Sequence, residues 1–137
     1  MRRLREATIG DPALARSADG EPAFWLVPFE SGGRACGFAR VDLSGRVAQI
    51  STFGAGADDT TSWPEADFFR RTPAGVLSDI RARHPGLPLA EPVLSYDGSS
   101  AKWAWRIAIG EPAKATAYVT PGGWYERPPG APQDREG

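Results

Sequence analysis

Chemistry in this chain would have to start from very few reactive side chains. The sequence holds one cysteine, Cys36, and one histidine, His84. A thiol and an imidazole act as nucleophile and base when a neighbouring cation or a helix N-terminus stabilises the thiolate. Cys36 instead stands beside Gly37 and Phe38 in an apolar strand, so we predict that it is a buried filler. His84 comes where a helix is expected to end, and capping of that end by its ring is the favoured role.

The same scarcity limits metal and nucleotide sites. One cysteine excludes a disulfide framework within the chain, and one histidine excludes a histidine-rich zinc cluster. Four carboxylates of a long loop have the oxygen ligands that hard cations take, namely Asp58, Asp59, Glu65 and Asp67. Their spacing does not match an EF-hand, and the Gly-Ala-Gly-Ala run beside them lacks the Gly-Lys-Ser/Thr ending of a phosphate-binding loop. We therefore predict a solvated acidic loop, with no catalytic residue, no metal site and no cofactor.

Aromatic residues are the better candidates for contact with another molecule. Trp103 and Trp105 share one face of a predicted strand, which favours core packing over a binding platform. Trp124 and Tyr125 differ, because they follow a Gly-Gly turn and precede a polar tail. Exposed aromatic side chains are common anchors of interfaces. The predicted surface for a protein or peptide partner consists of Gly122, Gly123, Trp124 and Tyr125.

Composition and charge exclude some classes of partner. The chain has 137 residues and a net charge of -1. Nucleic acid is not an expected partner, because phosphate binding needs clustered positive charge. Nothing approaches the roughly 18 apolar residues of a membrane span, and Asp11, Arg16 and Asp19 interrupt the apolar run that a signal peptide needs. We predict a cytoplasmic location and no membrane contact, and the oligomeric state stays open.

The elements that would position these residues begin with a group of three strands. Apolar runs at 24–29, 34–43 and 47–53 are separated by turns that contain glycine, which predicts a three-stranded meander. Pro28 has no N–H group, so its strand is expected to be an edge strand or to bulge near that point.

A helical region is predicted after this meander. A short helical stretch carries Phe68 and Phe69. Thr72 as N-cap and Pro73 at the first helical position then begin a second helix, which ends at Pro85-Gly86. The apolar stripe of that helix is formed by Val76, Leu77 and Ile80.

A second group of strands follows the helix. Strands are predicted at 92–96, 103–109 and 113–120, and Asp97-Gly98 favours a tight turn after the first of them. All these elements together predict one α+β domain, in which an antiparallel sheet of about six strands, made of two three-stranded meanders, packs against a central helix. The predicted boundaries are a flexible N-terminal arm at 1–20, a single domain at 21–127 and a disordered tail at 128–137.

The stretch from Thr72 to Tyr125 resembles a known small module. Its helix leaves through His84-Pro85-Gly86, strands follow, and the last of them reads AYVTPGGWYE. This order resembles the PepSY domain, and a cystatin-like sheet wrapped around a helix is the alternative. The PepSY resemblance implies a non-catalytic module that modulates peptidases or binds partner proteins.

The expected function is therefore that of a non-catalytic protein- or peptide-binding module, which acts on a peptidase or another partner. The alternatives are a small enzyme, either a hydrolase or a transferase, and a structural subunit of a larger assembly. An enzyme should have a water-lined cleft with convergent polar groups. A binding module should have an exposed apolar patch or an open sheet edge, and an assembly subunit a broad apolar face.

Overall fold

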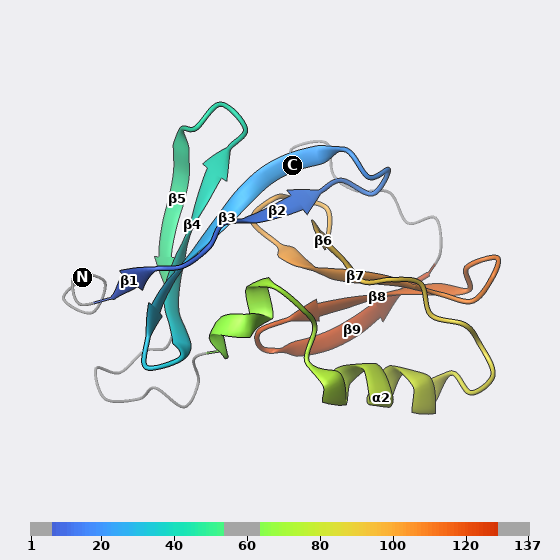
Figure 1. Cartoon of the computed structure of the whole chain (residues 1–137). Helices are drawn as coiled ribbons and strands as arrows, with labels where there is room; N and C mark the ends of the chain where they lie inside the picture. Colours follow the sequence, from blue (N-terminus) through green and yellow to red (C-terminus); the bar gives the residue numbers. More distant parts are fainter. Residues whose placement is uncertain (1–6, 54–63, 129–137) are drawn as a thin grey trace. The chain divides into compact units, whose positions relative to one another are not determined.

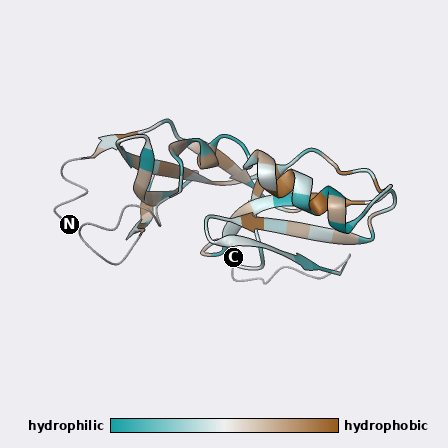
Figure 2. Ribbon diagram, turned by 90° about the horizontal axis from the view of Figure 1, so that it is seen from below, coloured by the Kyte–Doolittle hydropathy of each residue, from teal (hydrophilic) through white to brown (hydrophobic). Residues whose placement is uncertain are grey.

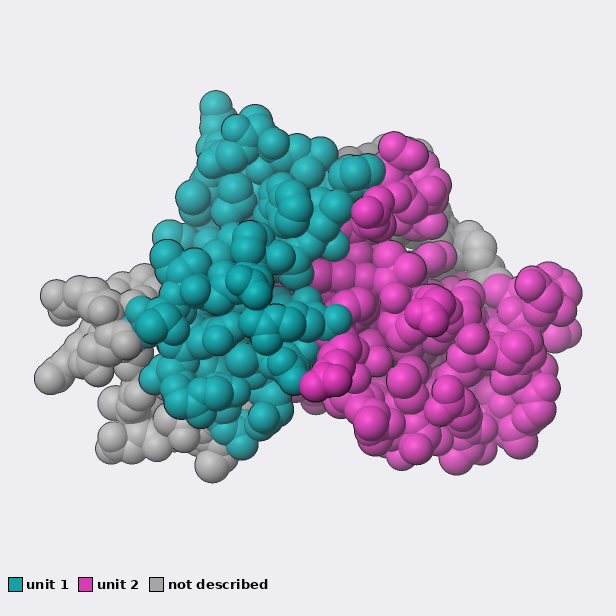
Figure 3. All heavy atoms as spheres, in the orientation of Figure 1, with its two compact units in different colours: residues 1–14, 22–70 teal, residues 15–21, 71–137 magenta. Residues whose placement is uncertain are grey.

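The computed structural model describes residues 7–53 and 64–128. The chain divides into two compact units, which have different colours in Figure 3. The first contains residues 1–14 and 22–70, and the second contains residues 15–21 and 71–137. The single domain predicted for 21–127 contains parts of both units. No helix of the described residues is long and apolar enough to cross a membrane.

The fold is mostly β, and the predicted α+β class was wrong. Strands hold 49% of the described residues and helices only 12%. The strands form two separate antiparallel sheets, one of five strands and one of four, in place of a six-stranded sheet packed against a central helix. The strands, labelled in Figure 1, are β1 (Thr8–Ile9), β2 (Ala13–Arg16), β3 (Pro22–Ser31), β4 (Arg34–Asp42), β5 (Val47–Thr52), β6 (Val93–Tyr96), β7 (Trp103–Ile109), β8 (Ala115–Thr120) and β9 (Gly123–Arg127).

The miscount of strands has a local cause. β1 and β2 lie within the predicted N-terminal arm and are too short for a period-two pattern to stand out. Both pair with the long strand β3, so they form because β3 offers them a partner and not because of their own propensity. β9 follows a Gly-Gly turn, and its aromatic residues favoured a binding surface over a strand.

The first sheet has the order β1-β3-β4-β5, and β3 to β5 form the predicted meander. Gly32 and Gly33, which connect β3 to β4, both have positive φ, at 62° and 82°. A two-residue hairpin turn that matches strand twist needs this conformation at both positions, and glycine adopts it without steric cost. The turn therefore fixes the register in which Ser31 lies opposite Arg34.

The strand that contains Pro28 bulges near this residue, which is one of the two predicted alternatives. β3 is a central strand, and its register with β4 shifts between Phe29 and Glu30, one residue beyond Pro28. The Pro28 carbonyl accepts a hydrogen bond from Gly10 N at 2.8 Å. The nitrogen and carbonyl of one strand residue point the same way, so the missing N–H of Pro28 also faces the break between β1 and β2, where no ladder bond is lost.

One face of the first sheet carries the core of its unit. Phe24, Leu26, Pro28 and Phe38 are buried on this face. The short 3-10 helix η1 (Ala66–Phe69) adds two buried phenylalanines, as predicted, and Phe53 links their rings to the sheet. The ring centroids of Phe53 lie 5.6 Å from Phe38 and 6.5 Å from Phe69.

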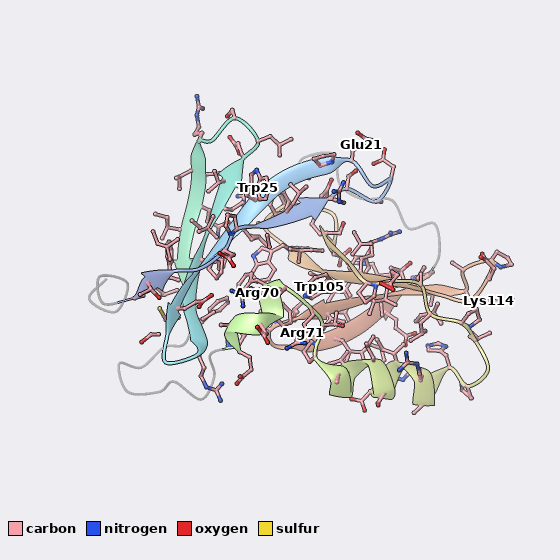
Figure 4. The ribbon with its side chains drawn as sticks, in the orientation of Figure 1. Glu21, Trp25, Arg70, Arg71, Trp105 and Lys114 are labelled. Atoms are coloured by element: carbon pink, nitrogen blue, oxygen red, sulfur yellow. The ribbon has the colours of Figure 1, made fainter. Side chains whose placement is uncertain are left out.

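The second sheet has the order β6-β7-β8-β9. Trp103 and Trp105 are 6% and 8% exposed, which confirms the core prediction; Figure 4 labels Trp105 on β7. On the opposite face of β7, Ala104 is buried as well, and Arg106 and Ala108 are half-buried. This sheet is therefore the better-buried of the two.

The helix α2 (Ala74–Arg83) belongs to the second unit. It begins after Pro73, whose backbone is extended, and no side chain caps it, so the predicted N-cap at Thr72 was wrong. Gly86, at φ 83°, ends the helical region as predicted. Only Ile80 of the predicted stripe is fully buried, whereas Val76 and Leu77 are half-buried.

Candidate binding edges

Each sheet ends in an edge strand, and the predicted partner-binding residues lie at one of these edges. Gly122 is exposed at the turn before β9, Gly123 is exposed as the first residue of β9, and Trp124 and Tyr125 follow it in the strand. Among the described residues, β9 pairs with β8 alone. Side chains alternate along a strand, so Trp124 and Glu126 share one face of β9, while Tyr125 and Arg127 share the other.

On the first face, β9 is attached to the end of α2. The Glu126 carboxylate lies 2.8 Å from His84 Nε2 and 3.8 Å from Arg83 Nη1. The guanidinium of Arg83 also lies over the Trp124 ring, 5.0 Å from its centroid, in a cation–π contact. His84, expected to cap the helix with its ring, instead joins the helix end to β9.

On the opposite face, β9 is attached to the loop after β6. The buried Asp97 carboxylate accepts a hydrogen bond from the Tyr125 hydroxyl at 2.5 Å. Arg127 Nε donates to the same carboxylate, 2.8 Å from Oδ1 and 2.9 Å from Oδ2. The Tyr125 ring stacks on Tyr118, with centroids 5.6 Å apart. A single carboxylate thus joins β6 and β9, the two edge strands of this sheet.

These contacts change the protonation behaviour of two groups. Burial, and then the hydrogen bond to Asp97, raise the pKa of Tyr125 above its usual value of 10.0. The same carboxylate raises the pKa of Arg127, which therefore stays charged. Tyr125 therefore remains a neutral hydrogen-bond donor to Asp97 at every ordinary pH.

Side chains on both faces of β9 are therefore already engaged within their own unit. Its C-terminal end is charged and hydrophilic (Figure 2), and charged side chains are a common way to protect an edge strand from pairing. Tyr125 is still 39% exposed. The assignment of Gly122, Gly123, Trp124 and Tyr125 to a partner surface stays a prediction.

The edge of the first sheet has a different character. β5 pairs only with β4 within the part of the chain that the structure describes. The sequence from Val47 to Thr52 contains no charged residue and no proline. Val47 and Ile50 are 54% and 52% exposed, although both are large apolar side chains. We call the outward side of residues 47–52 the β5 edge.

The exposed residues of β5 continue two apolar rows across the sheet. Cross-strand pairing places Trp25, Val41 and Val47 in one row. It places Val27, Ala39 and Ile50 in the next row, on the same face. Trp25, labelled on β3 in Figure 4, is half-buried, as are Val27 and Val41. This apolar face is opposite to the one that carries Phe38 and η1, and it runs out to the β5 edge.

The other residues singled out in the sequence already have local partners. Cys36 is 1% exposed and its thiol donates to the Phe29 carbonyl at 3.4 Å, whereas His84 belongs to the other unit. Glu65 pairs with Arg34 at 3.4 Å, and Asp67 pairs with Arg70, which follows η1. Asp58 and Asp59 lie outside the described residues. No group of three potential metal ligands occurs within 7–53 and 64–128.

Comparisons with protein-family models, with curated proteins and with solved structures find no match. The resemblance to the PepSY domain or to cystatins thus stays a prediction. The sequence did not indicate the contacts that attach β9 within its unit, or the exposed edge at β5. Asp97 is 30 residues from Arg127, and no local pattern indicates that they meet. For β5, the absence of charge from 47 to 52 was a usable signal.

Proposed function

We propose that this chain is a non-catalytic protein-binding module that accepts an extended strand of its partner at the β5 edge. The observation that carries the proposal is the pair of exposed apolar residues, Val47 and Ile50, on an edge strand without charge. Natural edge strands usually carry lysine, proline or a covering segment, because an open edge pairs with other chains. Residues 47–52 contain neither a lysine nor a proline, so this edge is suited to pairing.

The energetic basis is strand addition. Unpaired N–H and C=O groups along an edge supply hydrogen bonds to an added strand, and side-chain contacts on its faces supply specificity. At the β5 edge, the apolar face that includes Trp25 and Val41 would continue onto the added strand. Partner strands with β-branched or aromatic residues at alternate positions fit this face best.

The sharpest test places a photo-crosslinking amino acid at one position of the chain in its native host. At Val47 the photoreactive group projects from the β5 edge, and at Tyr125 it projects from β9. We expect adducts with a partner protein from position 47. The additional substitution Ile50→Lys should remove them, because it places a charge on the edge without disturbing a buried side chain.

Ile9→Lys is the matched control, since Ile9 is 74% exposed and lies in β1, at the other end of the same sheet. It should leave the adducts at position 47 intact. Adducts from position 125 and none from position 47 would contradict the proposal and favour the partner surface predicted at Trp124 and Tyr125. Adducts that survive Ile50→Lys would also contradict it.

A peptidase is one partner class worth including, because the stretch from Thr72 to Tyr125 resembles the PepSY domain. Purified peptidases identified among the adducts can be assayed with and without the chain. A change in their turnover that Ile50→Lys abolishes would support a modulating role. An enzyme or a structural subunit remains the alternative, and no contact described above favours either one.

A further inference from the structure

The geometry points to a second copy of this chain as an occupant of the β5 edge, paired antiparallel about a two-fold axis that passes beside Ile50. This inference rests on the proposed function, since it uses the same edge, and it names one partner. Three independent features of β5 carry it: the direction of its backbone groups, the match of its side chains under a two-fold axis, and its lack of charge.

The backbone direction follows from one hydrogen bond. Phe53 N donates to the Cys36 carbonyl of β4 at 2.8 Å. Backbone groups alternate sides along a strand, so Ser51 and Gln49 also face β4, whereas Thr52 and Ile50 present their N–H and C=O groups outward. In an antiparallel pair centred on Ile50, each Ile50 donates its N–H to the Ile50 carbonyl of the second copy. The outward groups of the two copies therefore satisfy each other.

The same register matches the side chains. Residues that lie opposite each other in an antiparallel pair share a face. Ile50 then lies against Ile50 of the second copy, and Gln49 lies opposite Ser51. Within one chain, Gln49 Nε2 already donates to Ser51 Oγ at 2.9 Å, so the two side chains are chemically suited to each other. A register shifted by one residue would place Gln49 opposite Ile50 and lose both matches.

Charge gives the reason for self-pairing. A two-fold axis brings identical residues together, so any charged residue at the centre of a strand would face its own like charge. Residues 47–52 are uncharged, and Arg46 lies just before them in the sequence, so no charged residue stands at the centre of the pair. The pairing also brings the row that ends at Ile50 in line with the same row of the second copy, on the same face of the joined sheets.

The first experiment measures the oligomeric state of the purified full chain by sedimentation equilibrium up to about 0.5 mM, where a Kd of about 0.1 mM leaves most chains dimeric. We expect a concentration-dependent dimer. Ile50→Lys should weaken it about tenfold or more, because the two lysines oppose each other at the axis. Ile9→Lys should leave it unchanged, and circular dichroism checks that both variants fold.

The second experiment tests the register. A mixture of Ile50→Lys and Ile50→Glu chains should form a one-to-one heterodimer, although each variant alone is monomeric, because the axis places position 50 opposite itself. Oxidation of Ile50→Cys should give a covalent dimer, since paired strands hold opposite Cα atoms about 5.5 Å apart, within disulfide reach. Gln49→Cys should not give a covalent dimer, because residue 49 lies opposite Ser51 of the second copy. The native Cys36 is buried, so it does not form the disulfide in its place.

The outcomes separate this inference from the proposed function. A wild-type chain that stays monomeric up to the highest concentration tested, or a dimer that Ile50→Lys leaves intact, overturns the second copy as occupant. If the monomeric chain still gives adducts with another protein from position 47, the β5 edge binds a different strand and the proposed function stands. If neither is seen, both are overturned.

Discussion

Removal of the Tyr125 hydroxyl is the most informative perturbation of the second sheet. The Tyr125 hydroxyl and Arg127 both bind the buried Asp97 carboxylate, and Tyr125→Phe removes one of these two contacts. A hydrogen bond to a charged group contributes about 1.5 to 3 kcal/mol. Tyr125 is 39% exposed, so water replaces part of the loss. We expect the free energy of unfolding at pH 8 to fall by about 1 kcal/mol.

The pH dependence gives this prediction its specificity. The folded state holds the Tyr125 pKa above 10.0, the value for an unperturbed tyrosine. Above pH 10 the unfolded chain loses this proton and the folded chain keeps it, so stability is complete below pH 10 and falls as the pH rises. For one group the loss at pH 11 is about 1.4 kcal/mol, and exposure reduces it to about 0.7 kcal/mol.

Urea unfolding followed by tryptophan fluorescence measures both effects, because Trp103 and Trp105 are buried and report on the second sheet. The stability gap between wild type and Tyr125→Phe should narrow from about 1 kcal/mol at pH 8 to about 0.3 kcal/mol at pH 11. Asp97→Asn should reduce the difference between the two pH values only in part, because burial is the larger cause of the raised Tyr125 pKa. A gap that is equal at pH 8 and pH 11 would refute the reasoning, since Tyr125 would then ionise alike in both states.

Three further predictions concern burial and pairing. Ile80→Ala should cost about 2 to 5 kcal/mol in urea unfolding, and Leu77→Ala only about 1 kcal/mol because Leu77 is half-buried; equal costs would mean that α2 is turned differently. A double-mutant cycle of His84→Gln and Glu126→Gln should give a coupling free energy of about 1 kcal/mol. A value near zero would show that the contact at 2.8 Å between the two side chains does not stabilise the fold. Cys36 should react with a thiol reagent only as fast as the chain unfolds, and rapid labelling at pH 7 would contradict its burial.

The sequence was sufficient for the local elements with strong patterns. The meander of β3, β4 and β5, the strands β6 to β8, the two phenylalanines of η1 and the exit of α2 at Gly86 were all predicted. Each has a short-range cause, either alternation of apolar residues or a glycine at positive φ. The start of α2 was misplaced by one residue, because Pro73 adopts an extended conformation that its fixed φ also allows.

What the sequence could not supply was pairing between distant segments. The division into two sheets depends on which strands exchange hydrogen bonds, and the apolar pattern of a strand does not name its neighbour. The same limit applies to both edges. Trp124 and Tyr125 look like anchors in the sequence, yet Arg83 and Asp97 engage them in the structure. Val47 and Ile50 belong to a predicted apolar strand, yet both are more than half exposed on an edge strand of the described sheet.

The most direct test of the β5 edge is amide hydrogen exchange by NMR, residue by residue. The spectra compare the dilute chain with a sample that holds excess of a peptide copying residues 46–53. Exchange at Ile50 and Thr52, whose N–H groups face outward, should slow on addition of the peptide. Exchange at Ser51 should change little, because its N–H faces β4. Protection that appears at Trp124 and Glu126 instead, with Ile50 and Thr52 unchanged, would contradict binding at the β5 edge.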